Sequence, residues 1–169
     1  MAAPWSHSMS FLKKNKTTVL FGLFVITLLG WLAMRLAIQR LSPRPEDVGV
    51  QADRLKLCPD SPNCVSTFDT DELHGMAAIP YAGNAAAAQD HLLTVLQNMP
   101  RTRIITNEPG YIRVEFRSLV WGFVDDGEFY LDETAGVIHF RSASRLGYGD
   151  SGVNRARMEQ LQADFLSSR

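Results

Sequence analysis

One long uncharged run near the N-terminus constrains this chain more than any other feature. Residues 17–34 read TTVLFGLFVITLLGWLAM, which is 18 residues without a charged side chain. As an α-helix the run spans roughly 27 Å, close to the ~30 Å hydrocarbon core of a bilayer. It is apolar on every face, which disfavours a helix in a globular core. The sequence therefore predicts a retained transmembrane anchor over residues 17–38, with a cleaved signal peptide as the alternative.

Charged residues indicate which side of the membrane each part occupies. Three lysines lie within residues 13–16, and the positive-inside rule then favours a basic cytoplasmic tail over residues 1–16. Three arginines within residues 35–44 weaken this preference. Residues 41–169 hold 12 basic and 18 acidic side chains, and so acidic a domain is a poor candidate for binding nucleic acid. We expect an inner-membrane protein with a periplasmic C-terminal domain.

The two cysteines, Cys58 and Cys64, lie six positions apart in the segment CPDSPNC. Two prolines stiffen the turn between them, so a disulfide is one interpretation and would require an oxidising compartment. Two unpaired thiols in a loop are the other. A closed zinc site needs four ligands, which this segment does not supply. The sequence predicts neither a metal nor a cofactor.

The remaining chain predicts a linker over residues 39–57 and one α+β domain over residues 58–169. Asn84 is expected to cap a helix that runs to Asn98, and residues 153–166 form a second amphipathic helix. Between them, alternating apolar residues predict four strands, at residues 103–106, 111–119, 123–131 and 137–143, with a possible edge strand at 76–81. Short connections favour an antiparallel meander of four to five strands, in the order (β)-α-β-β-β-β-α, with both helices on its apolar face.

The other face of this sheet is expected to be polar and solvated, with a docking surface for a partner as the functional alternative. Strand alternation places Asp126 and Glu128 on one face and Asp125 on the other. Such acids can bind a cation or serve acid–base catalysis, but more often they pair with nearby arginines. Their spacing matches no calcium loop.

The glycine spacing in the loop GYGDSG matches the dinucleotide-binding pattern G-x-G-x-x-G, but the sequence around it lacks the elements that this motif requires. Just 17 residues follow Gly152, too few for the parallel strand and acidic residue that this motif requires. A helix start flanked by Arg145 and Arg155 could still hold an anion. The alternative is that the glycines shape a tight turn and the arginines pair with Asp150 or Glu159.

Three segments in this order, CPDSPNCVST, FVDDGEFYLD and RSASRLGYGDSGVNRARME, resemble the family called domain of unknown function 1499. The family occurs in bacteria and plastids and has no established activity, and the resemblance covers roughly residues 57–166. Gly127 stands where the resemblance implies a larger residue, which suggests a bulge. The resemblance implies that the polar positions to examine are Asp125, Asp126, Glu128, Arg141, Ser142, Ser144, Arg145, Asp150, Asn154, Arg155 and Glu159.

Three hypotheses for function follow. The first is a non-enzymatic, membrane-tethered domain that binds a protein or a small anionic ligand where Asp126, Arg141, Arg145 and Asn154 converge. The second is a hydrolase-like enzyme that acts on an envelope lipid or glycan through the same residues. The third is a purely structural role, in which these groups form a buried salt-bridge network.

Overall fold

The computed structural model describes residues 6–167, which form two units. The first unit consists of helix α1 (Ser6–Leu41). Its segment Asn15–Leu41 has a mean hydropathy of 2.1 and is long enough to cross a membrane, a test that a signal sequence also passes. The predicted tail is therefore helical from Ser6 onward, and residues 1–5 lie outside the described part. The helix carries Arg35 stacked over the ring of Trp31, 5.1 Å from its centroid.

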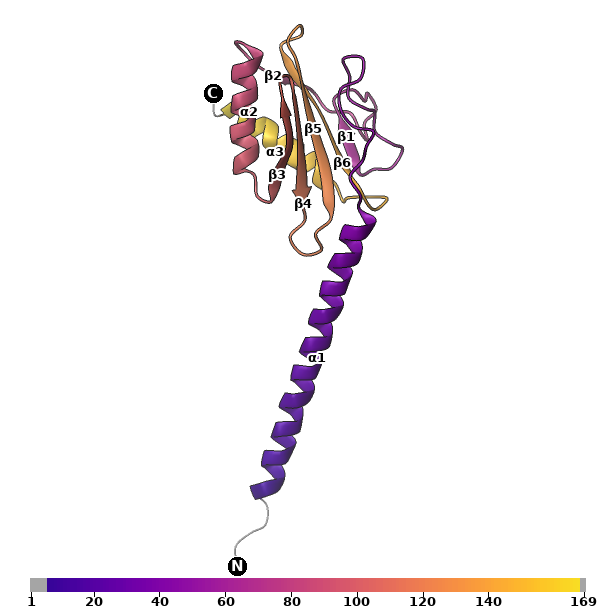
Figure 1. Cartoon of the computed structure of the whole chain (residues 1–169), viewed down its shortest axis with the longest axis vertical. Helices are drawn as coiled ribbons and strands as arrows, with labels where there is room; N and C mark the ends of the chain where they lie inside the picture. Colours follow the sequence, from indigo (N-terminus) through magenta and orange to yellow (C-terminus); the bar gives the residue numbers. More distant parts are fainter. Residues whose placement is uncertain (1–5, 168–169) are drawn as a thin grey trace, which may run out of the picture. The chain divides into compact units, whose positions relative to one another are not determined.

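The second unit begins at Leu41 and contains one six-stranded antiparallel sheet (Figure 1). Five strands follow the order β1-β6-β5-β4-β3, and β2 also pairs with β6. The strands are β1 (Cys64–Ser66), β2 (Ile79–Pro80), β3 (Thr102–Glu108), β4 (Tyr111–Arg117), β5 (Val124–Asp132) and β6 (Val137–Ser144). The predicted α+β meander is confirmed. Strand β1 is an addition, in a segment too short and too rich in proline for its alternation to be recognised.

Two helices, α2 (Ala85–Asn98) and α3 (Val153–Ser167), pack on one face of this sheet (Figure 1). Asn84 caps α2 as predicted, because its side chain accepts a hydrogen bond from the backbone N–H of Ala87 at 2.8 Å. The apolar stripes of both helices meet the inward side chains of the strands. The fully buried members of this core include Leu92, Leu96, Ile112, Phe129, Phe140, Met158 and Leu161.

Gly127 lies in the middle of β5, and the ladder runs through it without a bulge. It pairs with Val114 on one side and with Ser142 on the other. A Cβ atom at this position would lie 2.6 Å from Cε2 of Phe116, so the residue is glycine because the phenyl ring occupies the space. The bulge suggested by the sequence is therefore wrong. The regular pleat keeps Glu128 on the face opposite α2 and α3.

The predicted linker packs against that opposite face of the sheet. Ser42 and Leu55 are buried, with 6% and 3% of their surface exposed. The backbone N–H of Gly49 donates to Glu128 at 2.7 Å, and the carbonyl of Ser42 accepts from Arg145 at 3.4 Å. The polar composition and two prolines of this segment suggested a linker. In the structure the segment instead packs against the sheet, and its backbone groups form hydrogen bonds with side chains of the strands and of Arg145. We call residues 42–57 the covering segment.

Candidate functional site

A layer of charged side chains lies between the sheet and the covering segment. It contains three carboxylates and five arginines, and we call it the arginine–carboxylate layer. Its members are Glu115, Asp126, Glu128, Arg44, Arg113, Arg117, Arg141 and Arg145. The three carboxylate side chains are at most 2% exposed. The polar face that the sequence predicted to be solvated is therefore buried, and charges at this depth are tolerated only when they are paired.

Arg145 joins two of these carboxylates. Its Nη2 donates to Glu115 at 2.8 Å, and its Nε donates to Asp126 at 2.6 Å. Glu115 also accepts from Arg44 and Arg117, both at 2.9 Å, while Asp126 accepts from Nη2 of Arg113 at 2.9 Å. The guanidinium of Arg145 is 6% exposed. This part of the layer is a closed set of charge-assisted hydrogen bonds.

Glu128 and Arg141 form a looser pair at the other side of the layer. Oε1 of Glu128 accepts from the backbone of Gly49 at 2.7 Å and from the hydroxyl of Tyr111 at 2.9 Å. Oε2 lies 3.4 Å from Nη1 of Arg141, a long contact for an ion pair. The Nε atom of Arg141 is buried, has no hydrogen-bond partner among the described residues, and belongs to a side chain that is 9% exposed. Buried polar atoms of this kind require an explanation.

Arg141 lines a cavity of about 420 Å³ between the covering segment and the ends of β5 and β6. The cavity is therefore within the size range of small-ligand sites. Cationic and apolar side chains share its wall, and Asp47 and Asp126 are its acidic members. The full lining is Leu41, Pro43, Arg44, Pro45, Asp47, Val48, Lys56, Asp126, Arg141, Ala143, Ser144 and Arg145.

A second polar cluster lies on the helix-covered side of the same strands. We call it the asparagine cluster, and it consists of Asn63, Asp125, Ser142, Ser144, Asn154 and Arg157. Asn154 is fully buried at its centre. Its Oδ1 accepts from Ser142 at 2.6 Å, and its Nδ2 donates to the hydroxyl of Ser144 at 3.0 Å and to the carbonyl of Asn63 at 3.1 Å. Asp125 accepts from Ser144 at 2.6 Å.

The sheet therefore separates residues that the sequence placed in one site. Asp126, Glu128, Arg141 and Arg145 lie in the arginine–carboxylate layer, whereas Asn154 lies beyond the sheet in the asparagine cluster. The predicted convergence of Asn154 with Asp126 is wrong. Residues that the sequence did not mark as candidates for the site complete both groups. These are Glu115, Arg44, Arg113 and Arg117 in the layer, and Asn63 and Arg157 in the asparagine cluster.

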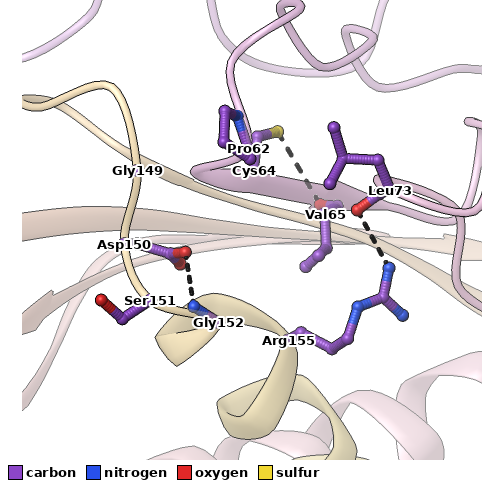
Figure 2. A pocket seen from close by; sticks show the side chains of 9 residues that line it. All are labelled: Pro62, Cys64, Val65, Leu73, Gly149, Asp150, Ser151, Gly152 and Arg155. Atoms are coloured by element: carbon purple, nitrogen blue, oxygen red, sulfur yellow. Dashed lines mark hydrogen bonds between the residues drawn. The ribbon is translucent and has the colours of Figure 1, made fainter.

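The glycine loop before α3 shapes a further hollow of about 280 Å³, shown in Figure 2. Asp150 occupies the helix start, because its carboxylate accepts from the backbone N–H groups of Gly152 at 2.9 Å and Asn154 at 2.7 Å. Arg155 donates to the carbonyl of Leu73 at 3.1 Å and so ties the helix to the segment after β1 (Figure 2). The helix start is thus already capped by a carboxylate, which favours the turn interpretation over an anion site there.

Cys58 and Cys64 are joined, with their sulfur atoms 2.05 Å apart. Of the two open interpretations the structure therefore has the disulfide, which connects the residue directly after the covering segment to the start of β1. Among residues 6–167, no group of three or more histidine, cysteine or acidic side chains is arranged to hold a metal ion.

The lowered pKa of Glu115 reflects how strongly its arginine partners stabilise the ionised carboxylate. Burial opposes its ionisation, but hydrogen bonds from Arg145, Arg44 and Arg117 outweigh this effect and lower the pKa from 4.5 to about 2. A carboxyl group whose pKa is lowered by folding stabilises the fold above its unfolded pKa. This contribution is lost as the pH falls towards the folded pKa.

We therefore expect the stability of the domain to fall as the pH is lowered from about 4.5 to about 2. The measurement is the free energy of unfolding at several pH values, for the wild type and for Glu115→Gln. The variant lacks the titrating group, so its curve should be flatter in this window. Glu108→Gln, a change at an exposed glutamate, is the control and should follow the wild type. Parallel curves for wild type and Glu115→Gln would contradict the assignment.

Comparison with known proteins identifies the family but no activity. No curated protein matches the chain, and no solved structure matches it. A family model described as "Protein of unknown function (DUF1499)" matches residues 54–165. The match includes β1 to β6, both helices of the domain, and every member of the arginine–carboxylate layer except Arg44. The chain therefore belongs to the DUF1499 family.

Proposed function

We propose that this chain is a single-pass membrane protein whose domain binds a small anionic ligand, a phosphate or a carboxylate, in the cavity beside Arg141. The observation that carries the proposal is the unpartnered Nε of Arg141, a buried donor on a side chain that lines this cavity. The Nε atom itself is covered, so a ligand in the cavity reaches this N–H group only when the side chain of Arg141 turns toward the cavity.

The charge of the layer points to an anion as the ligand. Five arginines face three carboxylates, which leaves a local excess of positive charge although the domain as a whole is acidic. Lys56 also lines the cavity but forms an ion pair with Asp47. A planar guanidinium can bind a phosphate or carboxylate with two parallel hydrogen bonds. Among the arginines of the layer, Arg141 has the longest ion-pair contact, at 3.4 Å, and a buried Nε without a partner among the described residues, so it is the ligand residue we propose.

Binding is better supported than hydrolysis. A general acid at neutral pH needs a carboxyl group whose pKa is raised, as in a desolvated pocket without cations. Glu115 shows the opposite, since its arginine partners lower its pKa to about 2. The layer thus stabilises the charged form of Glu115 rather than preparing this carboxyl group to transfer a proton.

The disulfide and the lysines before the apolar segment of α1 support a location of the domain outside the cytoplasm. The bond between Cys58 and Cys64 needs an oxidising compartment to persist. Lysines precede the apolar segment, which favours an N-terminus in the cytoplasm. In a bacterial cell these two features together support a periplasmic location for the domain.

Arg141→Ala is expected to weaken anion binding while the domain stays folded. Glu128 would lose its ion pair but keep its hydrogen bonds from Gly49 and Tyr111, so the stability loss should be about 1–2 kcal/mol, below that of a change at Arg145. Affinity should fall by tenfold or more, which corresponds to about 1.4 kcal/mol. The measurement is calorimetric titration of the full-length protein in detergent with inorganic phosphate and, separately, with succinate.

Arg101→Ala removes the same charge from an exposed position outside the cavity and is the matched control. It should bind as the wild type does. Equal loss of affinity in both variants would indicate general electrostatic attraction rather than a site. Absence of binding to either anion by the wild-type protein would count against the proposed function.

A further inference from the structure

The loop between β4 and β5 exposes four large apolar side chains. Leu119, Val120, Trp121 and Phe123 have 69%, 53%, 44% and 39% of their surface exposed. Single exposed apolar residues are ordinary, but a contiguous group in one loop usually marks an interaction surface. We call residues 119–123 the apolar loop.

The apolar loop lies at the end of the sheet where the chain enters the domain. Arg145 connects the two places: its backbone N–H donates to Val124 at 3.0 Å, and its side chain donates to the carbonyl of Ser42 at 3.4 Å. Val124 is the first residue of β5 and directly follows the loop, while Ser42 directly follows helix α1. Figure 1 shows the β4–β5 loop projecting from this end of the sheet.

No spacer separates the apolar helix from the packed part of the domain. The segment able to cross a membrane ends at Leu41, and Ser42 is already buried against the domain. A flexible linker would let the domain move away from the bilayer surface. Here the residue that directly follows α1 is already packed in the domain, so only a short stretch of chain is available to separate the entry end of the domain from the apolar segment.

The amino-acid composition of the apolar loop is typical of segments that lie in the headgroup region of a bilayer. Trp121 is of the type that concentrates at the boundary between headgroups and acyl chains, and its neighbours are apolar. Arg101 and Arg117 lie at the base of the loop, where their backbones pair with each other through Arg117 N–H and the Arg101 carbonyl at 3.2 Å. Arginines beside an inserted apolar group can form ion pairs with the phosphate groups of lipids.

We infer that the apolar loop inserts into the interfacial region of the membrane that holds the anchor and forms a second contact with it. The inference rests on the transmembrane anchor of the proposed function, but not on anion binding. The neighbouring β6–α3 loop extends the same surface, because Tyr148 is 77% exposed and one hollow of about 280 Å³ is lined by both Phe123 and Leu146. The occupant is thus the lipid surface itself rather than a protein.

The test uses the fluorescence of Trp121 in the full-length protein reconstituted into vesicles of phosphatidylcholine and phosphatidylglycerol. Trp5 and Trp31 are replaced by phenylalanine, so that Trp121 is the only tryptophan. We expect a blue-shifted emission, strong quenching by lipids brominated along their acyl chains, and weak quenching by acrylamide in the aqueous phase. Thermal unfolding of the same variant confirms that its domain is folded.

The matched control places the tryptophan at the other end of the sheet. Thr134 lies in the exposed β5–β6 turn, and Thr134→Trp in a background without the other tryptophans should respond only to acrylamide. Trp121 quenched by acrylamide and not by brominated lipid would overturn the inference. Protection of Trp121 from both quenchers would also overturn it, since a protein surface would then cover the loop.

Flotation of the same vesicles separates this inference from the anchor. A protein that floats with the lipid while Trp121 stays in water retains its anchor but lacks the second contact. A protein that does not float has no anchor, and it is then the proposed function that fails.

Discussion

Arg145→Ala is expected to destabilise the domain by about 3–5 kcal/mol, because it leaves two buried carboxylates short of a partner. Asp126 would retain only Arg113, and Glu115 would retain Arg44 and Arg117, whose side chains are 53% and 37% exposed. For a domain of this size, the melting temperature should fall by roughly ten degrees or more. The measurement is thermal unfolding of the full-length protein in detergent, followed by near-ultraviolet circular dichroism.

Arg141→Ala is the matched comparison, because it distinguishes an arginine that stabilises the fold from one that binds a ligand. Both residues are arginines of the same layer, and both side chains are less than one-tenth exposed. Arg145 makes short bonds to two carboxylates, whereas Arg141 makes one long contact. We expect a large loss of stability only for Arg145 and a loss of anion affinity for Arg141. Equal and large losses of stability would mean that the whole layer is structural, as in the third hypothesis from the sequence.

Asn154→Ala is the second change with a large expected effect. The substitution removes the partner of Ser142 and Ser144, leaves the carbonyl of Asn63 without its donor, and removes an acceptor from Arg157. Each buried polar group left unsatisfied costs about 1–3 kcal/mol, and relaxation should limit the total to roughly 2–4 kcal/mol. The free energy of unfolding from denaturant titration measures this loss.

Glu159→Ala is the control for Asn154, because Glu159 lies on the same helix with an exposed side chain. Its stability should stay within about 0.5 kcal/mol of the wild type. Anion binding by a still-folded Asn154→Ala protein should be unchanged, since Asn154 does not line the cavity and is connected to it only through its hydrogen bond with Ser144. A loss of binding by that folded variant would mean that the two clusters are coupled through the strands.

The elements of the fold were predictable from the sequence because each has a local cause. Alternation of apolar residues in 111–119 and 137–143 reproduces β4 and β6 to within two residues. The cap at Asn84 and the apolar stripe of α2 depend on positions only a few residues apart. Short turns then leave an antiparallel arrangement as the simplest way to pair the strands.

The composition of the site was not predictable in the same way. Alternation correctly assigns Asp125 and Asp126 to opposite faces, but it does not say which distant residues meet them. The covering segment ends more than 50 residues before β4 begins, and its polar composition resembles that of a free linker. Its contacts with Glu115 and Glu128 are long-range, and they convert a face expected to be wet into a buried one.

By itself, therefore, the sequence determined the apolar N-terminal helix, the strand and helix pattern, and the family to which the chain belongs. These depend on composition, on periodicity and on short motifs, which are local properties. Only the tertiary structure decided that Glu115 and Arg44 join the charged layer, that Asn154 lies apart from Asp126, and that Arg141 keeps an unpaired donor at a cavity. Those facts depend on which surfaces are buried against each other, and burial decides whether a charge is solvated, paired or available to a ligand.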